Sequence, residues 1–166
     1  MALSDPLRRV NFSHGQMLTA ADLAAEQAYL REKSRLHNRR LHGYGTVSGL
    51  DVSVADGCVV VSPGLAIDGL GREVVVTQPL TLRLEAHLDV RRWTRDVVIT
   101  WHETPETPVP GPDGTPVFTR WREHAEVRLV AHDEAGAEDL VLARLTGSRR
   151  RAVRVDGSVR RPLGLE

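Results

Sequence analysis

One uninterrupted helical pattern near the N-terminus constrains this chain more than any other feature. Thr19 is suited to cap the start of a helix, and Asp22, three residues later, stands where a capping box needs an acceptor. Neither glycine nor proline interrupts the residues that follow until Gly43, which occupies the place of a C-terminal cap. The sequence therefore predicts one helix over residues 19–42, about 35 Å long at roughly 1.5 Å per residue.

Helical spacing divides the apolar residues of this helix between two faces. A modest stripe suited to packing on a sheet contains Ala20, Leu23, Gln27, Leu30, Ser34, His37 and Leu41. Tyr29 and Leu36 form a smaller strip elsewhere, beside a basic ridge of Arg31, Arg35 and Arg39 at four-residue spacing. We predict that the smaller strip and the ridge bind a partner protein; the alternative is a helix flank covered by a loop.

After the helix the apolar period changes to two, which is typical of half-buried strands. Strands are predicted at residues 50–55, 58–62, 65–76 (a hairpin around a turn at 69–71), 80–84, 96–101, 117–131 and 140–145. The stretch 104–116 holds five prolines and two glycines and is predicted to be an exposed loop. The predicted fold is α+β, mainly antiparallel β, with the long helix packed on the β-structure.

The chain divides into an extended arm over residues 1–17, one domain over 18–147 and a basic tail over 148–166. In the arm, residues 7–17 are predicted to become ordered on contact with a partner. The tail holds six arginines and two acids, whereas residues 101–148 hold four arginines and nine acids. This asymmetry favours self-association between the tail and the acidic stretch of another copy.

Conformation, rather than chemistry, explains the glycines and polar residues of the motifs. Gly64, Gly69 and Gly71 lead into a strand and not into a helix, so we interpret them as turn glycines with positive φ and not as a phosphate cradle. Asn38 and His42 are expected to hydrogen-bond to the Gly43–Gly49 segment and to hold the turn into the first strand.

Composition excludes several function classes. Lysine plus arginine equals aspartate plus glutamate at 22 each, so nucleic acid is an improbable partner and no net field draws the chain to an anionic membrane. Cys58 is the single cysteine, so no intramolecular disulfide can form. The first ten residues contain no apolar segment, which argues against a signal peptide or membrane helix and predicts a cytoplasmic protein.

No catalytic or metal-binding pattern emerges from the titratable residues. The seven histidines show no His-x-x-x-His spacing, and His37 and His42, five residues apart, are expected on different helix faces. Asp51, Asp68 and Glu73 lie beside turns or on outward strand positions, where carboxylates are normally solvated. We predict no enzyme activity, no metal and no cofactor.

Three segments of the chain carry recognisable motifs. They are Phe12-x-x-Gly15-Gln16-x-Leu18-Thr19-x-x-Asp22, then Glu26-Gln27-x-Tyr29 through His37-Asn38-Arg39-x-Leu41-His42-Gly43-x-Gly45-x-Val47-x-Gly49-Leu50, and then VSPGLAIDGLGREVVV at 61–76. With these motifs the chain resembles a small family associated with gene clusters for phage-tail-like contractile injection particles. This resemblance implies a structural or assembly role near the baseplate of such a particle, with protein neighbours and no reaction of its own.

Two other functions remain open from the residues alone. A β-domain of this kind could bind a ligand such as a carbohydrate through Trp93, Trp101 or Trp121 and the proline-rich stretch. A small hydrolase using an Asp/His pair is the third alternative.

Overall fold

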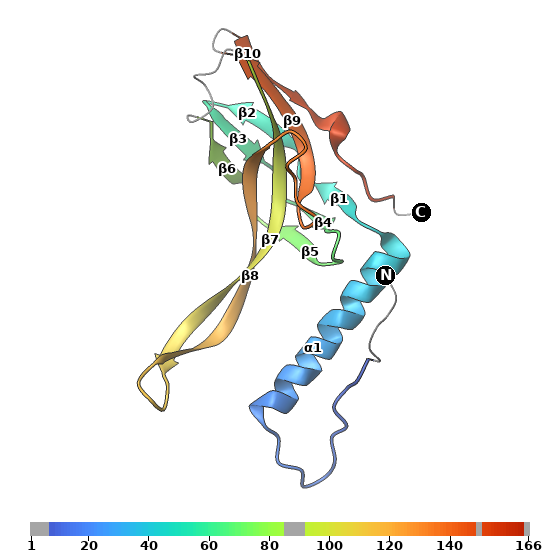
Figure 1. Cartoon of the computed structure of the whole chain (residues 1–166), viewed down its shortest axis with the longest axis vertical. Helices are drawn as coiled ribbons and strands as arrows, with labels where there is room; N and C mark the ends of the chain where they lie inside the picture. Colours follow the sequence, from blue (N-terminus) through green and yellow to red (C-terminus); the bar gives the residue numbers. More distant parts are fainter. Residues whose placement is uncertain (1–6, 85–91, 149–150, 165–166) are drawn as a thin grey trace.

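The structure is a computed structural model that describes residues 7–84, 92–148 and 151–164. Within these residues one long helix precedes ten strands, and the ladders between strands are antiparallel (Figure 1). The predicted α+β class with mainly antiparallel β-structure is therefore confirmed. The strands are β1 (Gly45–Gly49), β2 (Val52–Ala55), β3 (Cys58–Val61), β4 (Gly64–Ile67), β5 (Glu73–Val76), β6 (Leu80–Arg83), β7 (Trp93–Pro110), β8 (Pro116–Ala131), β9 (Leu140–Ser148) and β10 (Arg151–Asp156).

The helix begins and ends where its capping residues predict. The backbone N–H of Asp22 donates to the Thr19 hydroxyl (3.2 Å), and the N–H of Thr19 donates to the Asp22 carboxylate (2.9 Å), which completes the capping box. Helix α1 (Ala20–His37) continues into one π-helical turn (Asn38–His42). Gly43 ends it with φ +80°, a conformation that favours glycine.

Three sheets form the β-structure. The largest has the order β10-β9-β7-β8, and two smaller sheets have the orders β1-β4-β5 and β2-β3-β6. The predicted hairpins are present as β2–β3 and β4–β5, and the dense apolar run at 96–101 lies in β7, between β9 and β8. In space, β5 and β6 lie against β8, and β2 lies against β10. The small sheets thus cover one side of the large one.

Aliphatic side chains from all three sheets meet in a single core. Its fully buried members include Val59 and Val74 from the small sheets and Ile99, Leu142 and Leu145 from the large sheet. We refer to this sandwich, without α1 and without the distal part of β7–β8, as the body. Because the chain has few aromatic residues, most of the buried apolar residues in the described parts are valine or leucine.

A buried carboxylate links strands of the large sheet within the body. Asp96 of β7 accepts hydrogen bonds from Arg144 of β9 (2.8 and 3.3 Å), and the His132 ring lies 3.2 Å from its second oxygen. Burial by itself would raise the pKa of Asp96, but the hydrogen bonds from Arg144 and His132 outweigh it and hold that pKa below its ordinary value.

The prediction of an exposed loop over residues 104–116 is wrong. Strand β7 continues to Pro110 and β8 begins at Pro116, so only residues 111–115 form the tip of a long hairpin. Beyond Ile99, β7 pairs with β8 alone among the described residues, so its other edge has no strand partner there. Proline lacks a backbone N–H and is tolerated on such an edge, so the prolines do not interrupt the strand.

The described part of the predicted tail belongs to the body, whereas Arg149 and Arg150 lie outside the described residues. Strand β10 pairs with β9, and Pro162 forms a parallel bridge to Thr46 of β1. Leu163 is buried, and Arg160 donates to the Gly49 carbonyl at 3.0 Å. Apolar burial and strand pairing therefore outweigh the basic character that set these residues apart in the sequence.

The stripe predicted to pack on a sheet is exposed instead. Helix α1 has no buried side chain, and Leu23, Leu30 and Leu41 are 53%, 58% and 70% exposed. In Figure 1 the helix projects from the body rather than lying across it. The small sheets already occupy the face of the large sheet against which the stripe was expected to pack.

Candidate docking cleft

Helix α1 is anchored to the turn between β4 and β5 by its last residues. The Asn38 side chain, which is buried, donates to the Gly71 carbonyl (3.0 Å) and to the Glu73 carboxylate (3.3 Å). Arg39 donates to the Leu70 carbonyl at 2.8 Å. These bonds fix the direction in which the helix leaves the body.

The contact between α1 and the β4–β5 turn requires a glycine at position 71. Gly71 has φ +83°, and a Cβ at this position would collide with the Arg35 carbonyl of α1. Neither Gly64 nor Gly69 has positive φ, so that prediction holds for Gly71 alone. Close backbone approach explains the other two, since an added Cβ would lie 2.5 Å from the Leu50 nitrogen at Gly64 and 2.9 Å from the Ala137 oxygen at Gly69.

A buried carboxylate shapes the turn that receives the helix. The expectation that Asp68 is solvated is wrong, because its side chain is fully buried. It accepts hydrogen bonds from the backbone N–H groups of Leu70 (2.9 Å) and Arg72 (2.8 Å) and from the Arg72 guanidinium (2.5 Å). Arg72 also pairs with Glu138 at 2.9 Å, which ties the turn to the segment before β9.

Asn38 and His42 have structural roles other than those predicted. Asn38 bonds to the β4–β5 turn and not to the Gly43–Gly49 segment. His42 faces His37, with the two Nε2 atoms 3.1 Å apart, so the expectation that these rings lie on different faces is also wrong. The π-helical turn explains this, because its i→i+5 hydrogen bonding brings residues five apart to the same side.

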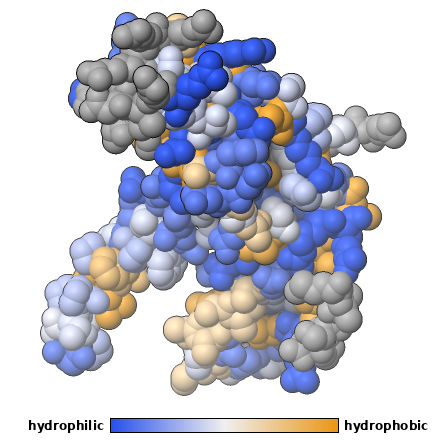
Figure 2. All heavy atoms as spheres, turned by 45° about the horizontal axis from the view of Figure 1, so that its top comes forward, coloured by the Kyte–Doolittle hydropathy of each residue, from blue (hydrophilic) through white to orange (hydrophobic). Residues whose placement is uncertain are grey.

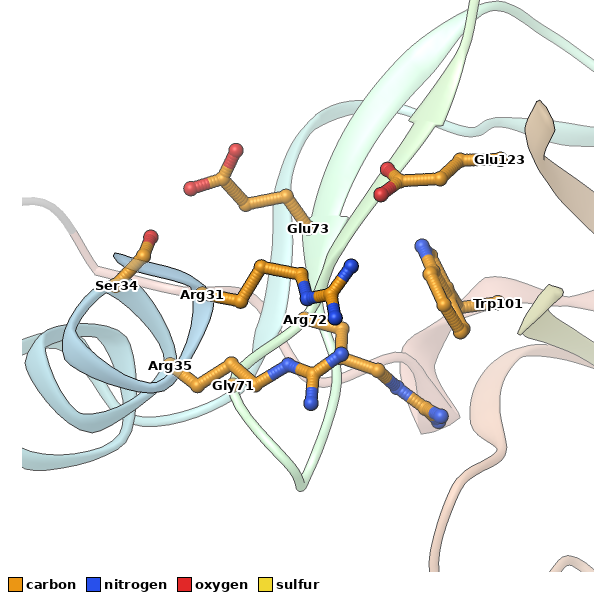
Figure 3. A pocket seen from close by; sticks show the side chains of 8 residues that line it. All are labelled: Arg31, Ser34, Arg35, Gly71, Arg72, Glu73, Trp101 and Glu123. Atoms are coloured by element: carbon orange, nitrogen blue, oxygen red, sulfur yellow. The ribbon is translucent and has the colours of Figure 1, made fainter. Parts of the chain in front are cut away.

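Three arginines gather around one tryptophan beside this junction (Figure 3). The guanidinium carbons of Arg72 and Arg35 lie 4.9 and 5.9 Å from the centre of the Trp101 ring, within cation–π range. Arg31 lines the same small pocket of about 120 Å³, together with Glu73 and Glu123. Arg35 and Arg39 therefore contact the chain's own body, and the predicted basic ridge is free mainly at Arg31.

A larger cleft opens where the helix and the long hairpin diverge. We call residues 103–123, the part of β7–β8 beyond the body, the outer hairpin. The cleft has a volume of about 720 Å³ and is lined by Gln27, Leu30 and Arg31 of α1 and by Glu103, Phe118, Thr119, Arg120, Trp121 and Glu123 of the outer hairpin. Figure 2 shows hydrophobic side chains on both projecting parts beside the gap.

The cleft is apolar at its centre and charged at its rim. Leu30, Phe118 and Trp121 are 58%, 46% and 62% exposed, although such large apolar side chains are usually covered. Arg31 and Arg120 contribute positive charge and Glu103 and Glu123 negative charge. An apolar centre within a polar rim is the arrangement of a protein–protein contact surface.

The predicted strip of Tyr29 and Leu36 lies away from this cleft. Both residues are half-buried, in contrast to the exposed leucines of the stripe. In the view of Figure 1 the described part of the N-terminal arm runs down beside the lower part of α1 and then turns into the start of the helix. Within the described part of the arm, Phe12 and Met17 are 51% and 86% exposed.

The three tryptophans do not form one binding site. Trp93 is buried in the core, where a Cβ on Gly147 would lie 2.5 Å from its ring. The ring of Trp101 makes cation–π contacts with Arg72 and Arg35. Of the three tryptophans, Trp121 alone is largely exposed.

The candidate carboxylates each have a structural partner. Asp51 pairs with Arg160 (3.2 Å), Asp68 with Arg72, and Glu73 accepts from Asn38. In residues 7–84, 92–148 and 151–164, no three histidine, cysteine or acidic side chains converge as metal ligands would. Nor is any helix in this part of the chain apolar and long enough to traverse a bilayer.

Comparison with known proteins gives structural neighbours but no sequence relatives. No family model matches the sequence, and no curated protein sequence is similar to it. The solved structures that share the fold include three at 12–15% sequence identity. All three are baseplate structures of the type VI secretion system or its component TssK.

A chain of the TssK–TssF–TssG baseplate subcomplex superposes with a TM-score of 0.61 at 14% identity, over 91% of this chain and 60% of that chain. A chain of the type VI baseplate complex gives 0.57 at 12% identity, over 92% and 58%. The crystal structure of TssK gives 0.52 at 15% identity, over 91% and 41%. The chain thus spans about 60% or less of the length of these neighbours.

The cleft itself was not predicted from the sequence. Phe118 and Trp121 stood beside a stretch interpreted as a loop, so no hairpin surface was assigned to them. The available signal was the apolar and aromatic content of residues 117–121, which is unusual for residues left exposed on a strand.

Proposed function

We propose that this protein is a noncatalytic structural or assembly component of a contractile, phage-tail-like injection particle, and that it assembles in the cytoplasm. The observation that carries the proposal is the pair of exposed limbs, α1 and the outer hairpin, on a fold shared with type VI baseplate proteins. The body supplies stability, and the limbs supply contact surface.

Exposure on the limbs supports docking. Leu30, Phe118 and Trp121 present large apolar groups to one cleft. Tryptophan and arginine are both enriched among the residues that dominate binding energy at protein interfaces. A monomer with no partner would leave this surface in water at a cost in free energy.

The arm and the second face of α1 complete the docking surface in this proposal. The arm, residues 7–17, exposes Phe12 and Met17 and becomes ordered against a neighbour. Tyr29 and Leu36, with Arg31, Arg35 and Arg39, contribute the helix flank. One of the neighbouring structures is the TssK–TssF–TssG baseplate subcomplex, and the proposed partners of this chain are baseplate proteins of the same kind.

Mass spectrometry of purified particles tests the proposal. Detection of the chain at a fixed stoichiometry is the expected result. Absence from particles and from every assembly intermediate would contradict it. A chaperone would be present in the intermediates alone, which would narrow the role to assembly.

Variants then locate the docking surface. Replacing Phe118 and Trp121 by alanine should leave the protein folded but reduce its incorporation into particles, and Tyr29→Asp with Leu36→Asp should do so through the helix flank. Val75→Ala is a matched control, because Val75 is 55% exposed on β5 and does not line the cleft. Equal incorporation of all variants would show that docking uses another surface.

One observation favours carbohydrate binding as a second candidate. Trp121 exposes its ring beside the carboxylates of Glu103 and Glu123, and sugars stack on such rings while polar groups bind their hydroxyls. Binding on a glycan array that is lost with Trp121→Ala would support this candidate.

A further inference from the structure

The exposed stripe of α1 has the spacing of a coiled-coil seam. Its members alternate at intervals of three and four residues, which is the a/d pattern of a heptad repeat. Within α1 they are Ala20, Leu23, Gln27, Leu30, Ser34 and His37, and all are exposed. Leu41 is exposed as well, but it lies in the π-helical turn, where the spacing of the seam ends. A strict a/d stripe is narrower than the apolar face that a helix needs to pack on a sheet, which agrees with its exposure here.

The rest of the helix surface near its C-terminal end is already occupied. Asn38 and Arg39 bond to the β4–β5 turn, and Arg35 lies over Trp101. The half-buried residues Tyr29 and Leu36 lie on a different side from the seam. The seam, by contrast, is exposed along α1 and carries the exposed leucines Leu23 and Leu30.

Charges beside the seam complement a parallel copy of the same helix. With Leu23 and Leu30 at d positions, Glu26 falls at g and Arg31 at the following e position. In a parallel pair, a g residue faces the e residue five positions later on the partner helix. Neither Glu26 nor Arg31 forms an ion pair within the part of the chain that the structure describes. Arg31 is exposed, whereas Glu26 is half-buried and one of its carboxylate oxygens is buried without a hydrogen-bond partner, so a second copy would give each side chain its counter-charge.

The outer hairpin provides a second wall for the incoming helix. Leu30 belongs to the seam and also lines the cleft, opposite Phe118 and Trp121. A helix lying on the seam would therefore have its flank against these two aromatic side chains.

We infer that the seam binds α1 of a second copy of this chain, in parallel, with Glu26 of each copy paired with Arg31 of the other. This inference rests on the proposed role of α1 as a docking surface and names the partner of that surface. Gln27, Ser34 and His37 make polar layers in the seam, which lower the affinity but favour one register.

Sedimentation velocity of the full chain across a concentration series tests self-association. The wild type should form oligomers, and Leu23→Asp and Leu30→Asp should each weaken association by at least about tenfold, because a charge replaces a buried leucine at the seam. Val75→Asp should associate like the wild type, since Val75 is equally exposed but lies on β5. Circular dichroism confirms that each variant is folded. A wild type that stays monomeric at every concentration would overturn the inference.

Charge reversal tests the pairing. Glu26→Arg alone and Arg31→Glu alone should each weaken association, because like charges would then face each other. The double variant should recover most of the loss. A double variant weaker than both single variants would overturn the proposed pairing.

A disulfide tests the orientation. In a Cys58→Ser background, Leu23→Cys should cross-link two copies under mild oxidation, because identical d positions face each other in a parallel pair. Two copies in antiparallel orientation would hold these residues too far apart, since a disulfide needs Cα atoms roughly 4.4–6.8 Å apart. An oligomer that does not cross-link would overturn the parallel arrangement.

These outcomes separate the inference from the proposed function. A monomeric chain that is nevertheless present in particles would remove the coiled coil and leave the docking role. A chain that forms the parallel oligomer but is absent from particles would support the coiled coil and contradict the docking role.

Discussion

The body and the two limbs of this protein differ in what their side chains do. In the body, residues such as Leu145 and Ile99 are fully buried and join three sheets into one core. In α1 no side chain is buried, and most of the outer hairpin is exposed. Two parts of one chain with similar apolar residues thus have opposite relations to solvent.

This difference shows that apolar residues need not all serve the stability of the monomer. Leucines in the body gain free energy from burial within the chain, whereas Leu23 and Leu30 in α1 gain it only when a neighbour covers them. Sequence periodicity treats both groups alike. Exposure in the tertiary structure separates them.

Truncating a leucine in each region should have the largest and most contrasting effect. Leu145→Ala should lower the free energy of unfolding by about 2–5 kcal/mol, because it opens a cavity in the core. Leu30→Ala should change it by less than about 0.5 kcal/mol, because Leu30 is exposed. Urea unfolding of both variants measures this, and equal losses would show that α1 is packed as tightly as the body.

Adding a methyl group at the junction of body and limb should have the next largest effect. Gly71→Ala should cost about 1–2 kcal/mol from positive φ alone, with a further cost from the collision with the Arg35 carbonyl. Gly57→Ala is the matched control, because Gly57 has φ +72° but nothing within 4 Å of an added Cβ. Thermal unfolding compares the two variants. Equal decreases in melting temperature would mean that the helix moves away from the added methyl group without loss of stability.

Removing the hydrogen bonds of the junction should follow. Asn38→Ala leaves the buried Gly71 carbonyl without its donor, at a cost of about 1–3 kcal/mol. We also expect faster hydrogen exchange in α1 while the strands of the body keep their protection. Unchanged stability with lost partner binding would instead identify Asn38 as a contact residue.

Acidification should destabilise the body through Asp96. The effect should be smaller than that of Asn38→Ala, because burial opposes part of the downward shift of the Asp96 pKa. Since its pKa is lower in the folded than in the unfolded state, its contribution is fully present above the unfolded value of about 3.9 and is lost as the pH falls through the folded value. Asp96→Asn should therefore flatten the decline of unfolding free energy below about pH 4. If the free energy of unfolding of Asp96→Asn declined as steeply at low pH as that of the wild type, other carboxylates would be responsible for the decline.

The smallest effect should come from the helix cap, at the far end of the limb. Thr19→Ala should cost the helix about 1 kcal/mol, because the Asp22 backbone N–H loses its acceptor. Hydrogen exchange in the first turns of α1 measures this locally. Thr94→Ala, on β7, is a control that should leave exchange in α1 unchanged.

Much of the fold could be predicted because its signals are local. The capping box of Thr19 and Asp22, the cap at Gly43 and the β2–β3 hairpin all depend on residues close together in sequence. The extension of β7 through Pro105 and Pro110 could not be predicted in this way, since proline is tolerated only because that edge has no neighbour. Burial of Asp68 likewise depends on Arg72 and on the segment carrying Glu138.

The candidate site was predicted only in part for the same reason. Arg31 of the helix lines the cleft, but Phe118 and Trp121 enter it from a hairpin about ninety residues away in sequence. Whether Tyr29 and Leu36 bind a partner stays a prediction.

By itself, the sequence determined where the helix and most strands begin and end, because caps, turns and alternation act over a few residues. Only the tertiary structure decided which apolar face remains open. Burial depends on what covers a residue, and here the small sheets cover the large sheet and leave the seam of α1 in solvent. The helix pattern contains the seam, but its exposure is a property of the packing around it.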